Sequence, residues 1–256
     1  TREHLSVRKP LFEAAFGYKN AFARADILNP VGRNQWDIIE VKSSTSVKEI
    51  NLDDLAIQKY TYEGAGLQIR RCILMHINNE YVRKGKINLD ELFIRRDVTK
   101  EVDALLPRVE QDLDAMIRVI RQKKSPEVPI GPHCSDPFEC PLEYLCWAFL
   151  PEDNPTTLYR VRTEKAFDLI QQGVTSITQL PSDFTFTGNQ QIQAGCARSK
   201  KPHIDRNALR EFLAKLEHPL CFLDFETFGT AVPLFDGVSP YQQVPFQFSL
   251  HIEEKP

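Results

Sequence analysis

The chain has 256 residues, of which 42% are hydrophobic, 10% aromatic and 26% charged. These proportions are typical of a soluble protein with a hydrophobic core, and they exclude a disordered or fibrous chain. The 32 Lys and Arg residues against 35 Asp and Glu residues give a formal net charge of −3, so any nucleic-acid surface must be a local basic patch. No stretch is apolar for long enough to span a bilayer, and no signal-like segment opens the chain.

The first part of the chain predicts a small mixed sheet. Short apolar or alternating runs, separated by turn residues, predict strands at 11–16, 21–28 and 36–42. A helix is expected over 52–65, with Asn51 as a candidate N-cap. Its first turn carries Asp53 and Asp54, and a buried strand follows over 71–77. Strand, helix and strand in this order favour a crossover unit in a mixed sheet.

Helical periodicity dominates the next part of the chain. Apolar residues recur at three- and four-residue steps over 102–120, and Lys123–Pro126 ends this helix. Two short helices are expected within 158–180, followed by a polar and irregular segment to Lys201. A further helix is expected at 205–216, and strands at 220–225 and 246–252. These changes in texture predict three domains, at 1–150, 151–204 and 205–256.

Charged residues of two neighbouring predicted strands form the most informative pattern. Asp26 lies near the end of one strand, and Glu40 and Lys42 end the next on the same face, because side chains alternate along a strand. Two carboxylates from neighbouring strands make an oxygen-rich site that suits Mg²⁺ or Mn²⁺. A lysine beside such an ion can orient the attacking water or help to deprotonate it. On the following helix, Gln58 and Tyr62 are four residues apart and share one face.

This ordered set of Asp, Glu-x-Lys and Gln-x-x-x-Tyr resembles the motifs of the RecB-like PD-(D/E)XK nucleases, especially the CRISPR-associated and AddB-type members with an iron–sulfur cluster. The resemblance implies an α/β fold of the restriction-endonuclease type, with a mixed sheet flanked by helices. It also implies metal-dependent hydrolysis of DNA, with single-stranded ends as the expected substrate, in DNA repair or defence. By resemblance, Asp26 and Glu40 hold the ion and Lys42 acts at the nucleophile. Gln58 and Tyr62 would position the site or the DNA strand.

Three of the six cysteines, Cys134, Cys140 and Cys146, lie close together in the sequence. The spacing is a poor disulfide framework for a chain of this size, so it favours a metal site in a cytoplasmic protein. The iron–sulfur RecB-like nucleases have a similar arrangement, which implies a [4Fe–4S] cluster. Its fourth ligand is expected upstream of Thr1, which would make the sequence a fragment. His133 as a ligand and Zn²⁺ as the metal remain alternatives.

A second acidic pair, Asp224 and Glu226, lies on a strand expected to be buried. Paired carboxylates at this spacing resemble the start of the two-metal site of DnaQ-like exonucleases, which have an RNase H-like fold. Together with Pro240–His251, the strand resembles a bacterial family that joins a RecB-like nuclease to a DnaQ-like segment. The three expected domains are therefore a nuclease domain ending in the cysteine cluster, a helical linker, and the truncated start of an RNase H-like domain whose site lacks its later acids.

A locally basic stretch follows the helix that carries Gln58, and its members are Arg70, Arg71, Arg83, Lys84 and Lys86. Such a patch could follow the phosphate backbone of DNA and would make binding depend on salt. Two alternatives to a DNA nuclease remain open. One is an inactive nucleic-acid-binding or scaffold protein that keeps the nuclease fold, and the other is a zinc-stabilised endonuclease that acts on structured DNA or RNA.

Overall fold

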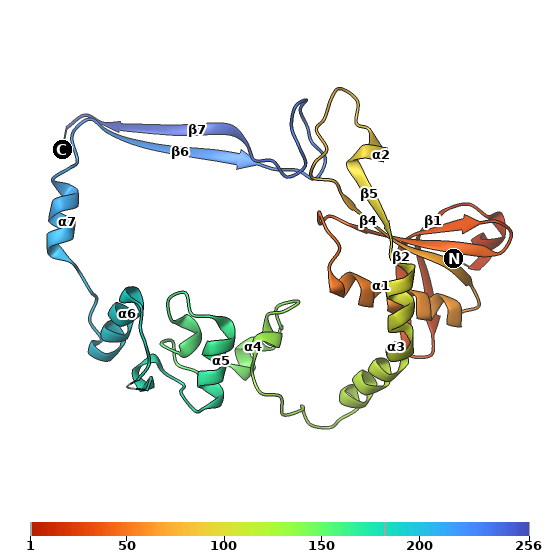
Figure 1. The fold of residues 1–256 in the computed structure, drawn as a ribbon, viewed down its shortest axis with the longest axis horizontal. Helices are drawn as coiled ribbons and strands as arrows, with labels where there is room; N and C mark the ends of the chain where they lie inside the picture. Colours follow the sequence, from red (N-terminus) through yellow and green to blue (C-terminus); the bar gives the residue numbers. More distant parts are fainter. Residues whose placement is uncertain (1, 182, 256) are drawn as a thin grey trace. The chain divides into compact units, whose positions relative to one another are not determined.

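A computed structural model describes residues 2–181 and 183–255. Its contacts divide the chain into two compact units, which are Thr1–Ser125 with Cys221–Ile252, and Pro126–Leu220 with Glu253–Pro256. The expected third domain, 205–256, is thus divided between the first and the second unit. Figure 1 shows the elements of both units. No helix in the described part of the chain is long and apolar enough to cross a membrane.

The first unit contains a five-stranded mixed sheet in the order β1-β2-β3-β4-β5. Neighbouring strands are antiparallel except for β3 and β4, which are parallel and joined through α1. The strands are β1 (Leu11–Tyr18), β2 (Ala21–Val31), β3 (Gln35–Lys42), β4 (Gln68–Ile77) and β5 (Phe93–Asp97). The helices are the 3₁₀ helix η1 (Arg2–Val7), α1 (Glu49–Gly64), α2 (Leu89–Leu92) and α3 (Thr99–Ile120). The predicted mixed sheet with a crossover helix is confirmed.

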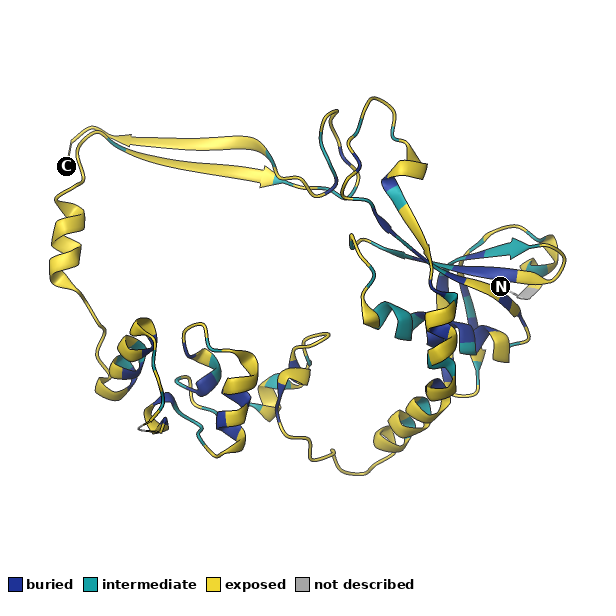
Figure 2. Ribbon diagram, in the orientation of Figure 1, coloured by how far each residue is buried: buried dark blue, intermediate teal, exposed yellow. Residues whose placement is uncertain are grey.

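Helices α1 and α3 pack against each other and against the sheet, and the core lies between these layers. Alternate residues of β2 are buried, as a strand with one covered face requires. Leu55 and Tyr62 of α1 join them in the core together with Val102 and Val109 of α3. Each fully buried apolar side chain contributes about 1.5–3 kcal/mol, so this layer determines where α1 lies on the sheet. In Figure 2 this core appears as the dark-blue segments of the five-stranded sheet and of α1.

The last turn of α1 lies very close to β1. A Cβ atom added to Gly64 would lie 2.2 Å from Cδ1 of Tyr18, so only glycine fits here without moving the ring. The start of α1 differs from the prediction, because the helix begins at Glu49 and Asn51 is not its N-cap. Instead, the Asn51 side chain accepts a hydrogen bond from the backbone N–H of Lys48 at 3.0 Å. Asp54 therefore lies in the second turn of α1 rather than in the first.

The second unit consists of short helices around a small core of its own. They are η2 (Pro132–Cys134), α4 (Glu143–Cys146), η3 (Pro155–Thr157), α5 (Thr163–Gln171), η4 (Ile177–Gln179), α6 (Gly188–Ser199) and α7 (Arg206–Leu213). Its core packs Leu158 and Leu169 against Ile177 of η4 and Ala194 of α6. The predicted helices at 158–180 and 205–216 are confirmed in shorter form, as α5, η4 and α7. The expectation of an irregular segment before Lys201 is wrong, because α6 occupies most of it.

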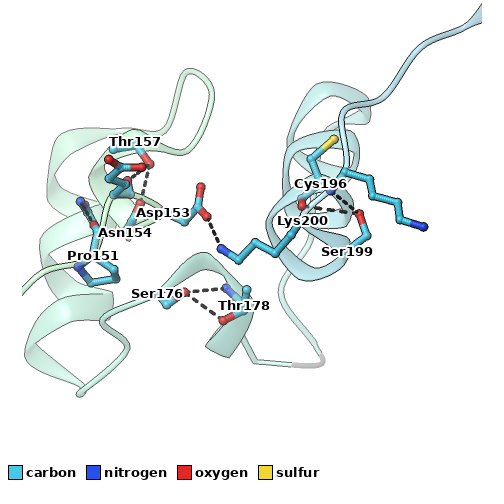
Figure 3. A network of polar contacts seen from close by, with 11 residues as sticks. Pro151, Asp153, Asn154, Thr157, Ser176, Thr178, Cys196, Ser199 and Lys200 are labelled. Carbon is cyan, nitrogen blue, oxygen red and sulfur yellow. Dashed lines mark hydrogen bonds and ion pairs between the residues drawn. The ribbon is translucent and has the colours of Figure 1, made fainter.

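Polar contacts hold the second unit together, as Figure 3 shows. Asp153 accepts a hydrogen bond from Lys200 Nζ at 3.1 Å (Figure 3). Its carbonyl accepts one from the Ile177 N–H at 2.7 Å. The Asn154 side chain donates to the carbonyl of Pro151 at 2.9 Å. These hydrogen bonds join η3, η4 and the end of α6, so Asp153 and Asn154 have a structural role in the second unit.

β6 (Leu220–Phe228) and β7 (Val244–Glu253) form a two-stranded ribbon, which confirms the strands predicted near the C-terminus. Almost all of its residues are exposed, including Phe222, Phe225, Phe246 and Phe248. Figure 2 draws the ribbon in yellow for this reason. The expectation that β6 is buried is wrong for the described residues, because the two strands pair only with each other and no layer covers them.

Candidate functional site

Asp26, Glu40 and Lys42 come together on the neighbouring strands β2 and β3. The strands pair with Ile27 opposite Ile39, so the same register continued by one residue brings Asp26 opposite Glu40. Asp26 Oδ2 accepts a hydrogen bond from the backbone N–H of Val41 at 2.7 Å. Asp26 lies within β2, which continues to Val31, rather than near a strand end.

The carboxylate of Glu40 is the centre of this group. Only 7% of the residue is exposed. Its Oε1 atom accepts a hydrogen bond from Lys42 Nζ at 2.7 Å, and its Oε2 atom accepts one from Gln58 Nε2 at 2.9 Å. Because Gln58 belongs to α1, these contacts join the end of β3 to the crossover helix. Gln58 is thus placed with the acid group, as the motif predicts.

Asp54 is a member of the site that the sequence reasoning missed. Lys42 Nζ donates to Asp54 Oδ2 at 2.8 Å, and Gln58 Nε2 donates to Asp54 Oδ1 at 3.2 Å. Asp54 and Gln58 are four residues apart on α1, so they share one helix face. The four-residue spacing is the sequence signal for this contact, but a helix that starts at residue 52 puts Asp54 in the first turn, where an acid has a simpler explanation.

Burial and charge shift the pKa values of the two central groups. Burial raises the pKa of Glu40, and it outweighs the hydrogen bonds from Lys42 and Gln58, which lower the pKa; the charges of Asp26 and Asp54 add to the rise. Burial by itself lowers the pKa of Lys42, but the hydrogen bonds to Asp54 and Glu40 outweigh it, so the pKa is raised. Lys42 is therefore an ammonium held between two carboxylates.

Tyr62 is completely buried, and its hydroxyl reaches the strands rather than the acid group. The hydroxyl accepts a hydrogen bond from the Ala25 N–H at 2.8 Å and donates one to the carbonyl of Ala14. Burial raises the pKa of Tyr62 to about 12, so the hydroxyl remains protonated. Because Ala25 precedes Asp26, this contact fixes the backbone beside the first carboxylate.

The donor atoms of this site fit a hard divalent ion. Carboxylate and amide oxygens are the preferred ligands of Mg²⁺ and Mn²⁺. Gln58 Oε1 is buried and has no hydrogen-bond partner among the described residues, so an acceptor oxygen remains available beside Glu40. At the same time, the part of the chain that the structure describes holds no group of three or more His, Cys, Asp or Glu side chains arranged to bind a metal. The ammonium of Lys42 bridges Glu40 and Asp54 instead.

All six cysteines are free thiols, and the three clustered ones differ in their surroundings. Cys134 is buried against Ile130 and Phe167, Cys140 is half-buried, and Cys146 is exposed. The Cys140 N–H donates to the carbonyl of Cys134 at 2.7 Å, so the two backbones are in contact. The neighbouring Trp147 has a buried Nε1 atom without a hydrogen-bond partner among the described residues. An indole N–H of this kind is a suitable donor to thiolate sulfur, the ligand of an iron–sulfur cluster.

The second acidic pair lies on the exposed ribbon. Asp224 and Glu226 are both exposed on β6 and, two residues apart on a strand, point to the same side. Asp224 Oδ1 accepts a hydrogen bond from the N–H of the next residue, Phe225, at 3.0 Å. The partner strand of β6 is β7, and its one acidic residue is Glu253 at its last position.

The predicted basic residues do not form one free patch. Arg70 binds both carboxylate oxygens of Asp37 through Nε at 2.9 Å and Nη2 at 2.6 Å. Arg71 forms an ion pair with Asp97 at 3.3 Å. Arg83 forms contacts with the loop that joins β6 to β7. The other two predicted residues, Lys84 and Lys86, line an open pocket of about 800 Å³ formed by the segment that follows β4.

A family model matches part of this chain. Residues 221–256 match a family described as "Domain of unknown function (DUF2779)". The matched segment covers the β6–β7 ribbon and the loop between its strands. None of the curated proteins that were compared matches the chain.

Proposed function

We propose that this protein is a Mg²⁺- or Mn²⁺-dependent nuclease of the RecB-like PD-(D/E)XK type that hydrolyses phosphodiester bonds in DNA. The observation that carries the proposal is the connected group of Glu40, Lys42, Asp54 and Gln58, with Asp26 bonded to the same strand. Its supports are the mixed sheet and the crossover helix, which bring the motif residues to one place. Single-stranded ends in DNA repair or defence are the proposed setting, by resemblance alone.

Asp26 and Glu40 are the proposed ligands of the divalent ion, and Gln58 Oε1, which has no hydrogen-bond partner among the described residues, lies on the side chain that contacts Glu40. When bound, such an ion polarises the phosphate and makes water a stronger nucleophile at neutral pH. The hydrogen bond between Asp26 and the Val41 N–H fixes one carboxylate relative to β3. The Gln58 side chain fixes the other, because it donates to Glu40 from the opposite layer.

In this proposal, the ammonium of Lys42 supplies positive charge next to the phosphate, on which negative charge develops in the transition state. Its ammonium is held by Glu40 and Asp54 and is 26% exposed, so one side remains open to a substrate. A fixed ammonium beside the reacting phosphate stabilises the transition state without reorganising during the reaction. The hydroxyl of Tyr62 acts indirectly, because it accepts a hydrogen bond from the Ala25 N–H and so fixes the backbone of β2 next to Asp26.

We also propose that Cys134, Cys140 and Cys146 hold an iron–sulfur cluster that braces the start of the second unit. The unpaired N–H of Trp147 would donate to one of its sulfur ligands. Zinc is the alternative metal, because thiolate sulfur also suits Zn²⁺. Asp224 and Glu226 are not proposed to act alone, since two-metal hydrolysis requires more ligands than this pair provides.

The test of the proposed function is cleavage of end-labelled single-stranded DNA with Mn²⁺ or Mg²⁺ present. We expect cleavage by the wild-type protein, abolition by a chelator, and a loss of about 100-fold or more in the Glu40→Gln variant. Glu110→Gln, a change of the same kind on α3, is the matched control and should leave cleavage unchanged. DNA binding without cleavage by the wild-type protein would contradict the nuclease and favour the inactive binding protein.

A further inference from the structure

The loop that joins β6 to β7, residues 229–243, contacts the backbone beside the candidate site. The hydroxyl of Tyr241 donates a hydrogen bond to the carbonyl of Ser43, the residue that follows Lys42. The next carbonyl, that of Ser44, accepts a hydrogen bond from the Ile77 N–H at 3.1 Å. The chain leaving β3 is therefore held by the loop and by β4. Figure 1 shows the loop in blue near the turn that follows β4.

Arg83 anchors this loop to the first unit. Its Nη1 atom donates to the carbonyls of Pro233 at 3.0 Å and Leu234 at 2.7 Å. The backbones also pair, because the Arg83 N–H donates to the Val238 carbonyl at 3.2 Å and the Gly237 N–H donates to the Arg83 carbonyl at 2.9 Å. Contacts of this number and kind fix the position of the loop.

Tyr241 adopts a backbone conformation that is unfavourable for a residue with a side chain. Its φ angle is +59°, in the left-handed region that residues with a Cβ atom rarely adopt. The conformation is held locally by the Tyr241 N–H, which donates to the carbonyl of Thr230 at 2.8 Å. Strain at the residue that reaches the candidate site points to a functional reason for its orientation.

We propose that Tyr241 is a positioning residue that holds the Lys42 end of β3 through the carbonyl of Ser43. The ammonium of Lys42 must point toward Glu40 and Asp54, and its direction depends on the backbone from which its stem leaves. The ribbon segment that matches a domain of unknown function thus becomes part of the support of the site. The effect on catalysis rests on the proposed nuclease function, whereas the tether itself does not.

The test compares Tyr241→Phe with Tyr159→Phe, a change of the same kind in the second unit. Amide hydrogen exchange should become faster over residues 41–46 and at Ile77 in Tyr241→Phe, and it should not change there in Tyr159→Phe. This readout is independent of DNA cleavage. Unchanged exchange in Tyr241→Phe would overturn the tether, whatever the activity.

Steady-state cleavage then tests the consequence for Lys42. One lost hydrogen bond is worth about 1 kcal/mol, so the kcat of Tyr241→Phe should fall about three- to tenfold while KM for DNA remains unchanged. The unfolding temperature should fall by no more than a few degrees. Faster exchange with unchanged kcat would overturn the positioning role. Faster exchange in a protein that cleaves no DNA at all would contradict the proposed nuclease and leave the tether supported.

A second variant, Arg83→Lys, keeps the charge but loses the planar fork that binds two carbonyls. Exchange should become faster over 229–243 as well as over 41–46, because the anchor of the loop is weakened. If Arg83 served only as a positive charge for DNA, lysine would replace it and exchange would remain unchanged, which would contradict its anchoring role.

Discussion

Asp54→Asn should strongly reduce DNA cleavage while leaving the fold intact. In the wild-type protein, Asp54 receives hydrogen bonds from Lys42 at 2.8 Å and from Gln58 at 3.2 Å. Asparagine has the same size, but it carries no charge and its amide nitrogen cannot accept a hydrogen bond. The substitution therefore removes one of these two bonds and leaves Glu40 as the only charged partner of Lys42 among the described residues.

The effect on stability should be small and the effect on activity large. The side chains of Asp54 and Lys42 are 42% and 26% exposed, so solvent screens the pair and its loss costs about 1 kcal/mol or less. Catalysis is more sensitive, because a displacement of about 1 Å in a reacting group lowers the rate by about 100-fold. We expect kcat to fall about 10- to 100-fold with an unfolding temperature within a few degrees of wild type.

Asp53→Asn provides the matched control on the same helix. Asp53 pairs with Arg108 of α3 at 2.7 Å, and both side chains are largely exposed, at 40% and 57%. Its removal should change neither cleavage nor stability measurably. Rates are measured with end-labelled single-stranded DNA and Mn²⁺, and unfolding is followed by circular dichroism. Full activity of Asp54→Asn would refute the reasoning, and an equal loss in both variants would indicate damage to α1 rather than to the site.

Three further predictions concern the core and the cysteines. Gly64→Ala should lower the free energy of unfolding by about 1–3 kcal/mol, because its Cβ would lie 2.2 Å from the Tyr18 ring. The control is Gly195→Ala in α6, where a Cβ would meet nothing within 4 Å, and this change should be neutral or stabilising by up to about 1 kcal/mol. Equal urea unfolding curves for the two variants would exclude the close approach. Burial raises the pKa of Cys72 to about 12 from 9.0. The free energy of unfolding should therefore fall as pH rises from about 9 toward 12, since the unfolded chain loses this proton first. Urea titrations at several pH values should show a steeper fall of this free energy with pH for wild type than for Cys72→Ala, and an identical pH dependence would contradict the burial of this thiol. Protein purified without oxygen should be brown with broad visible absorbance, and Cys140→Ser should lose the colour; a colourless wild-type protein with bound zinc would contradict the iron–sulfur proposal.

The meeting of Asp26, Glu40 and Lys42 could be predicted because it depends on local rules. Alternation along β3 puts Glu40 and Lys42 on one face, and a short turn makes β2 its neighbour. The place of Asp54 depends on the true start of α1 at Glu49, which no strong capping residue marks. Strand β5 was missed because most of its residues are exposed and two of its five are arginines.

The surroundings of β6 and Arg83 could not be predicted because they depend on distant parts of the chain. The apolar composition of β6 predicts burial, but burial requires a covering layer, and β7 is its only partner among the described residues. Arg83 looked like a phosphate ligand because it lies in a basic stretch. Its guanidinium binds carbonyls about 150 residues away, at Pro233 and Leu234, and local sequence carries no signal for such a contact.

Cleavage of labelled DNA by the Lys42→Ala variant tests the central assignment most directly. Lys42 is partly exposed, but alanine removes the ammonium that pairs with the buried carboxylate of Glu40, so some loss of stability is expected and circular dichroism must show that the variant is folded at the assay temperature. The nuclease assignment predicts that Mn²⁺-dependent cleavage falls by about 100-fold or more while DNA binding persists. Cleavage by Lys42→Ala at the wild-type rate would contradict it, because the reaction would then occur elsewhere in the protein.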